Sequence, residues 1–150
     1  RLLPSGPTAI DMIANAALTI GLSLGLRARM DLVRAIFPFA YAEQNLYRAA
    51  KHGLMAELFW PAERAPAPRL RSARELVLEL LPVAEGGLIA GGVHPDEARA
   101  LLAVIEARVQ TGRTGAVVQR ALVGEHDRDL AAMVERYLGH AAAEQPVHLW

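Results

Sequence analysis

The sequence contains no cysteine. This absence excludes disulfide bonds, a thiol nucleophile and a cysteine-ligated zinc site, and it is compatible with a reducing cytoplasm, where we expect the protein to reside. Aromatic residues are also scarce, at 5 % of the chain, although 53 % of its residues are hydrophobic. Much of that hydrophobic content is Ala and Leu, which are strong helix formers. We therefore expect a mainly helical protein.

The chain has no surplus of charge, because 16 Lys and Arg residues balance 16 Asp and Glu residues. Broad electrostatic capture of nucleic acid depends on such a surplus, so we expect no nucleic-acid partner. A local site for a small anion stays compatible with this balance. No signal peptide is visible, and because the chain begins with Arg1 rather than Met, we expect further sequence before it.

The longest uncharged stretch, residues 12–26, is shorter than the roughly 20 apolar residues that span a membrane, and it contains three polar residues. Its Gly21-x-x-x-Gly25 pair is a helix-association signal chiefly in membrane helices. We therefore expect no membrane partner, and we interpret this stretch as a central helix buried on several sides.

Common catalytic motifs are missing as well. There is no Gly-rich nucleotide loop, no Gly-x-Ser-x-Gly and no His-Glu-x-x-His, and the five histidines lack the spacing of a metal site, so we assign no metal ligand. Arg113-Thr114-Gly115 could bind an anion at a helix N-terminus, but a single motif of this kind is a weak signal. By its chemistry alone the chain is a soluble helical domain.

The pattern of apolar residues and caps predicts about six helices in one helical region, residues 1–150, with a surface loop around Phe59–Pro68 and no strand of useful length. Pro82 should kink its helix. The first expected helix covers residues 9–26, with Thr8 as N-cap and Asp11 completing a capping-box-like pair. A short helix starting at Asp31 and a helix from Pro38 to His52 follow. The remaining expected helices are one after the capping box Ser72–Glu75, two covering residues 95–112 and 114–122, and one from Asp127. Two helices carry apolar faces that should point inward: Ala98, Leu101, Leu102, Ile105 and Val109 on one, and Leu130, Met133, Val134, Tyr137 and Leu138 on the other. We also expect the C-terminal tail, residues 145–150, to be non-helical and to pack through Trp150.

The stretch Asn45–Leu54 is the strongest candidate for function. It predicts the last turns of a helix that ends at Gly53, a residue suited to the left-handed conformation after a helix. Asn45, Arg48 and His52 then share one stripe, with Lys51 on its flank. The cations either complement the helix dipole and stay solvated, or converge with the amide on an anionic substrate. Another side of this helix carries residues suited to a core: Leu46, Ala49 and Ala50.

Two stretches resemble the C-terminal part of bacterial carboxylate–amine ligases of the second glutamate–cysteine ligase family. In that family Arg-x-x-Asp-x-x-x-Thr ends a strand and leads into a long Ala-rich helix. Here Arg1 and Thr8 match, while Pro4 stands in place of the Asp. The family pattern Asn-x-x-x-x-x-Arg-x-Gly-Leu is matched by Asn45, Gly53 and Leu54, with Lys51 in place of the Arg.

Further stretches are similar to subfamily features: Arg74–Pro82, Gly112–Ala116 with Gln119-Arg120, and Pro146-Val147-His148-x-Trp150. The resemblance implies the helical C-terminal portion of an α+β ligase, whose antiparallel sheet and metal-binding glutamates lie mostly upstream. The parent enzyme would use ATP and Mg²⁺ to phosphorylate a carboxylate, such as that of glutamate, before an amine attacks the acyl phosphate.

The resemblance also implies roles for individual residues. Arg1 and Lys51 would be the catalytic residues that hold a phosphate or carboxylate. The candidate substrate-binding residues are Asn45 and Thr8, which match the family patterns, together with Arg48 and His52, which the helical spacing places beside Asn45. Asn45 could instead satisfy backbone groups, and Gly53 could simply maintain the turn. The expected partners are a small amino-acid substrate and the rest of the protein's own chain, and homo-oligomer formation stays open. The alternative to a ligase is a non-catalytic helical interaction or regulatory module.

Overall fold

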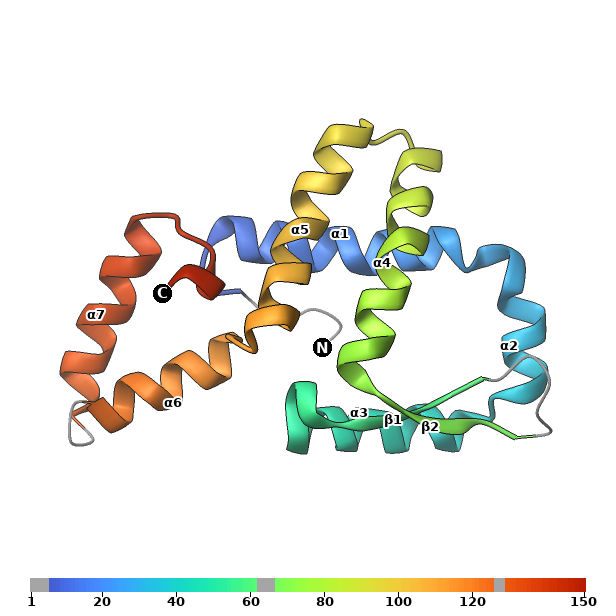
Figure 1. Ribbon diagram of the computed structural model, residues 1–150, viewed down its shortest axis with the longest axis horizontal. Helices are drawn as coiled ribbons and strands as arrows, with labels where there is room; N and C mark the ends of the chain where they lie inside the picture. Colours follow the sequence, from blue (N-terminus) through green and yellow to red (C-terminus); the bar gives the residue numbers. More distant parts are fainter. Residues whose placement is uncertain (1–5, 62–66, 126–128) are drawn as a thin grey trace.

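The computed structural model describes residues 6–61, 67–125 and 129–150, and within these residues the protein is mainly helical, as predicted (Figure 1). Short 3₁₀ turns lie at Arg27–Arg29, Gly53–Met55 and Val147–Leu149. The helices and strands are, in order, α1 (Ala9–Gly25), α2 (Met30–Ile36), α3 (Phe39–His52), β1 (Glu57–Trp60), β2 (Arg69–Ser72), α4 (Ala73–Ala90), α5 (Pro95–Thr111), α6 (Gly115–Glu125) and α7 (Leu130–Ala142).

The core lies where α1 crosses the hairpin formed by α4 and α5 (Figure 1). Most of the apolar face predicted for α5 is buried there, with Leu101 packed at its margin. Gly112 ends α5 in the left-handed conformation, with φ 72°, also as predicted. The residues of the central cluster are Ala17, Ala84, Leu88, Ala98 and Leu102.

Glycines let α1 and α4 approach to backbone contact. A Cβ added to Gly21 would lie 2.9 Å from the carbonyl carbon of Ala84, and one added to Gly87 would lie 2.6 Å from the backbone nitrogen of Gly25. Real Cβ atoms do not come this close to backbone atoms, so only glycine fits at these crossings. The Gly21–Gly25 pair therefore mediates the close packing of α1 on α4, although we expected such a pair to matter chiefly in membrane helices.

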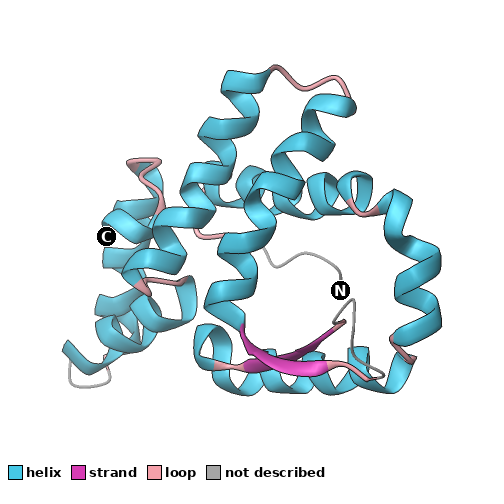
Figure 2. Cartoon of the chain, turned by 45° about the vertical axis from the view of Figure 1, so that its right-hand side comes forward, coloured by secondary structure: helices cyan, strands magenta, loops and turns pink. Residues whose placement is uncertain are grey.

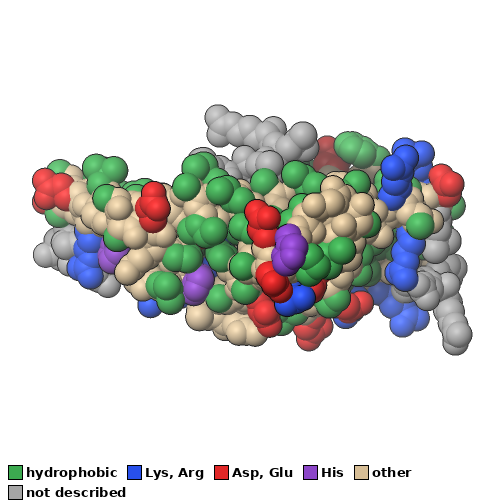
Figure 3. Space-filling view, turned by 90° about the horizontal axis from the view of Figure 1, so that it is seen from above, with side chains coloured by type: hydrophobic (Ala, Val, Ile, Leu, Met, Phe, Trp, Pro, Cys, Tyr) green, Lys and Arg blue, Asp and Glu red, His purple; other side chains and the backbone are tan. Residues whose placement is uncertain are grey.

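The prediction that α1 is buried on several sides is wrong for this chain. One face is buried, and the other leaves Met12, Ile13, Ile20 and Leu24 between 39 and 53 % exposed. Figure 3 shows exposed hydrophobic side chains scattered over the upper face of the molecule, with Lys and Arg gathered at the end where α2 lies. None of the helices in the described residues is long and apolar enough to cross a membrane.

The segment predicted as a surface loop around Phe59 contains a two-stranded antiparallel ribbon instead (Figure 2). In this ribbon Phe59 pairs with Leu70 and Trp60 pairs with Arg69. A four-residue strand is too short to show an alternating pattern, so its pairing depends on tertiary support. That support comes from α3, whose Tyr41 ring lies 4.8 Å from the ring of Phe59, measured between centroids.

Several local predictions need correction. Leu46, predicted to suit a core, is 70 % exposed, and α3 has no buried residue. Ser72 is the N-cap of α4 but makes no side-chain capping bond, so the predicted capping box is not formed. The last helix, α7, is capped by the side chain of Asp129. Asp127, the predicted start of this helix, lies outside the described residues. Three residues predicted to point inward from α7 are largely exposed instead: Leu130, Val134 and Leu138.

The C-terminal tail packs through Trp150, as predicted, although Val147–Leu149 also forms a 3₁₀ turn. Val147 and Trp150 are buried with Val118 and Leu122 of α6, and Tyr137 of α7 packs against them. The Trp150 indole donates a hydrogen bond to the carbonyl oxygen of Gln145 at 2.7 Å. The tail therefore closes the space between α6, α7 and the central helices.

Candidate functional site

The carboxamide of Asn45 holds strand β1 against helix α3. Its nitrogen donates to the carbonyl oxygen of Phe59 at 2.8 Å, and its oxygen accepts from the Phe59 N–H at 2.7 Å. The backbone N–H and the carbonyl group of Phe59, on the free edge of strand β1, are thereby both paired. Of the two roles considered for Asn45, the geometry favours the satisfaction of backbone groups over direct contact with a substrate.

Arg48, one turn further along α3, also faces β1. Its guanidinium lies 5.1 Å from the centroid of the Phe59 ring and donates a long hydrogen bond, 3.4 Å, to the carbonyl oxygen of Glu57. The cation–π contact and the stem of the side chain cover one face of the aromatic ring. Asn45 and Arg48 therefore lie on one face of α3, as predicted from their spacing, and both side chains contact strand β1 of the two-stranded ribbon.

Lys51 and His52 are placed differently. Both are exposed at the C-terminal end of α3, and within the described residues neither side chain makes a hydrogen bond or an ion pair. Gly53 follows with φ 55° and turns the chain toward β1. These two side chains are the part of the predicted group that can reach a substrate, and the Lys51 ammonium also complements the helix dipole.

Thr8 caps helix α1, as predicted. Its hydroxyl oxygen accepts from the Asp11 N–H at 3.3 Å, and its O–H donates to Oδ2 of Asp11 at 2.8 Å. Thr8 is itself 4 % exposed, and no hydrogen bond joins it to α3 within the described residues. Arg1, the other residue assigned to this end of the site, lies outside the described residues.

Asp11 is the centre of a buried polar cluster that sequence reasoning missed. Its side chain is fully buried and forms an ion pair with Arg108 of α5, with Nη2 2.8 Å from Oδ1. The backbone N–H of Val147 donates to both carboxylate oxygens, at 3.3 and 3.2 Å. Arg108 also donates to Oδ1 of Asn15 at 2.7 Å. With both oxygens of Asp11 already bonded, this carboxylate is a structural anchor and not a general base.

His148 borders the same cluster. Burial is the largest influence on its imidazole and lowers its pKa below the ordinary value of 6.5; Asp11 opposes that shift and Arg108 adds to it. Its Nδ1 and the Nε of Arg108 are buried without a hydrogen-bond partner within the described residues. The one sequence signal for this cluster is the lone acidic residue Asp11 at the head of an otherwise uncharged helix, a position that by itself predicts only a cap.

The last turns of α5 bring the two family-like stretches to one part of the molecule. Arg108 binds Asp11, which lies three residues after Thr8, at the start of the Ala-rich helix that follows the first stretch. Leu54, which ends the second stretch, packs against the buried cluster of Ala14, Val104, Ile105 and Val109. Stretches that are more than 30 residues apart in the sequence therefore share one support, although no described contact joins Thr8 to Lys51 or His52.

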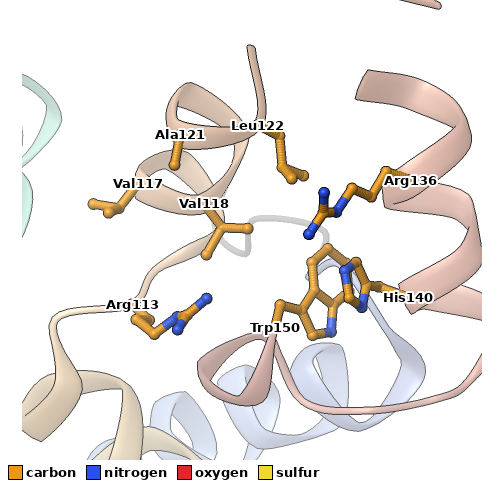
Figure 4. Close-up of a pocket in the computed structure, with 8 residues that line it drawn as sticks. All are labelled: Arg113, Val117, Val118, Ala121, Leu122, Arg136, His140 and Trp150. Carbon is orange, nitrogen blue, oxygen red and sulfur yellow. The ribbon is translucent and has the colours of Figure 1, made fainter. Parts of the chain in front are cut away.

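A second candidate site is an open pocket of about 280 Å³ between α6, α7 and the C-terminal turn. Figure 4 shows Arg113 and Arg136 extending toward Trp150 from opposite sides. The His140 ring is stacked on Trp150 with 5.0 Å between centroids. The remaining lining is apolar and comes from α6: Val117, Val118, Ala121 and Leu122.

Comparison of the chain with models of protein families, with curated proteins and with solved structures gives no match. Within the described residues there is also no group of three or more His, Cys, Asp or Glu residues that could hold a metal ion.

Proposed function

We propose that this chain is the helical C-terminal part of an ATP-dependent carboxylate–amine ligase resembling the second glutamate–cysteine ligase family. Its substrate would be a small amino acid, and its reaction would form an amide through an acyl phosphate. The observation that carries the proposal is the shared anchoring of the two family-like stretches on α5, by the Asp11–Arg108 ion pair and by the packing of Leu54.

In this proposal Lys51 supplies positive charge to the anionic groups of the substrates, and the imidazole of His52 can donate a hydrogen bond to them. Phosphoryl transfer is accelerated mainly by positioning and by cations placed around the developing charge. Lys51 acts as a point charge, because a primary ammonium lacks the forked geometry of the arginine that the family carries at this position. Arg1 would add a bidentate clamp, and Thr8 would hold the helix that follows it.

Asn45 and Arg48 act indirectly in this proposal. By binding Phe59 they fix the end of α3 against β1, and so they set the direction in which Lys51 and His52 project. The family's cofactors, ATP and Mg²⁺, fit this chain only in part. The cations suit the phosphates of ATP, whereas the described carboxylates form no metal site, and the resemblance assigns the metal ligands to upstream glutamates.

The test is ADP formation by the natural full-length protein with ATP, Mg²⁺, glutamate and an amine acceptor. Lys51→Ala should lower kcat/KM well over about tenfold, because it removes a charge that acts on the transition state. Lys51→Arg, which restores the family residue, should retain activity. Arg34→Ala is the matched control, since it removes an exposed cation from α2. Full activity of Lys51→Ala in a protein with unchanged circular dichroism would refute the assignment.

A helical interaction module is the alternative, and exposed apolar surface is the observation that favours it. On α3 and the turn that follows, Phe39, Leu46, Tyr47 and Met55 are 70 to 80 % exposed. Patches of this kind mark surfaces that contact other protein segments. The ligase proposal assigns that contact to the upstream sheet of the same chain. Full-length protein that forms no ADP with any amino acid, yet binds another protein through this face, would favour the module.

A further inference from the structure

We propose that the pocket between α6, α7 and Trp150 binds a small organic anion with an apolar body. This inference goes beyond the ligase proposal and does not depend on it. The site is built from residues of three separate segments: Arg113 precedes α6, Arg136 and His140 belong to α7, and Trp150 ends the C-terminal turn (Figure 4).

The lining has the charge pattern of an anion site. Two arginines and a histidine line the pocket, and none of its described lining residues is acidic. In a chain with equal numbers of acidic and basic residues, the described lining is thus rich in basic side chains. Guanidinium groups bind carboxylate and phosphate oxygens through paired hydrogen bonds. Arg113 is exposed at the rim, and its described hydrogen bond uses only its backbone N–H, which donates to Thr111, so its guanidinium is available.

The apolar walls of the pocket suit a ligand that has an apolar part. Val117, Val118, Ala121 and Leu122 of α6 form one wall, and the Trp150 indole forms another. Trp150 is held in place by three contacts: the stack with His140, an edge-to-face contact with Tyr137 at 5.0 Å, and the indole hydrogen bond to Gln145. A preformed aromatic wall beside convergent polar groups is the usual composition of a small-molecule site.

The size of the cavity sets the class of ligand. About 280 Å³ lies near the lower limit for small-molecule pockets, which suits a single ring or short aliphatic body bearing one anionic group. A carboxylate and a phosphate monoester share this chemistry. A bare inorganic anion would leave the apolar walls without contact, and a neutral ring would leave the Arg113 guanidinium without a partner.

The experiment is titration of the full-length protein with benzoate and with phenyl phosphate, followed by fluorescence. The protein has two tryptophans, so the variant Trp60→Phe leaves Trp150 as the remaining indole in this sequence. We expect saturable changes with a dissociation constant roughly in the millimolar range. The tighter of the two ligands identifies the anionic group. Benzamide, the neutral analogue of benzoate, and inorganic phosphate, which lacks the ring, should each bind at least about tenfold more weakly.

Matched variants assign the binding to this pocket. Arg113→Gln keeps a polar side chain but removes the charge, and it should weaken benzoate binding about tenfold. Arg120→Gln removes an exposed charge from α6 without touching the pocket, and it should change nothing. The proposal is overturned by equal binding of benzoate and benzamide, by equal effects of the two variants, or by the lack of a saturable change. Because Lys51 takes no part, this result is independent of the ligase assay.

Discussion

The Nη2 atom of Arg108 donates both to Oδ1 of Asp11, at 2.8 Å, and to the backbone carbonyl oxygen of the same residue, at 3.1 Å. One guanidinium nitrogen thus joins the first turn of α1 to the last turns of α5. Because the Val147 N–H binds the same carboxylate, the beginning of α1, the end of α5 and the C-terminal turn meet at a single buried charge. Four predictions follow from this and from the other tertiary contacts.

Arg108→Met should destabilise the protein by about 3–5 kcal/mol, because it leaves the buried Asp11 carboxylate without its cation. Chemical denaturation measures the effect. Arg99→Met is the control on the same helix: Arg99 pairs with Glu85 and Asp96 on the surface, so its loss should cost no more than about 1 kcal/mol. Equal losses of stability in the two variants would show that the buried ion pair stabilises the protein no more than the exposed one.

Gly87→Ala should destabilise the protein by about 1–3 kcal/mol or more, because the new methyl group collides with the backbone of Gly21 and Gly25. Its neighbour provides the opposite test. Gly86 lies in the same helix, and a Cβ there would meet nothing within 4 Å. Gly86→Ala should therefore stabilise the protein by about 0.5–1 kcal/mol. Thermal unfolding of the two variants checks the signs, and stabilisation by both would contradict the close packing of α1 on α4.

Asn45→Ala should cost about 1–3 kcal/mol, since the N–H and the carbonyl group of Phe59 both lose their partner. The neighbouring Gln44 is exposed, so Gln44→Ala should stay within about 0.5 kcal/mol of the parent. Urea denaturation measures both. An unchanged stability together with a lost ligase activity would assign Asn45 to the substrate and not to β1.

His148 should make the protein less stable below neutral pH. Its folded-state pKa is lowered mainly by burial, so between that value and the unfolded pKa of about 6.5 the unfolded chain binds more protons than the folded one. Stability is therefore fully present above about pH 6.5 and falls as the pH drops below it. Free energies of unfolding for the parent and His148→Gln, measured between about pH 5 and pH 8, should converge in acid. If the difference between the two free energies of unfolding stayed constant across that range, the lowered pKa of His148 would not be the cause.

The sequence by itself determined the helical class of the protein and most of its helix ends. Thr8 caps α1, and Gly53 and Gly112 end α3 and α5 with positive φ, because capping and left-handed turns are decided by residues close together in the chain. The apolar face of α5 was equally readable, since helical periodicity is local.

Tertiary structure alone decided which side chains meet. Asn45 was visible as a polar residue on a helix, but only the fold places Phe59 against it, and only the fold pairs Asp11 with Arg108 across most of the chain. The two-stranded ribbon and the pocket beside Trp150 were missed for the same reason. Contacts between distant segments depend on how whole elements pack, and neither spacing nor propensity within one segment carries that information.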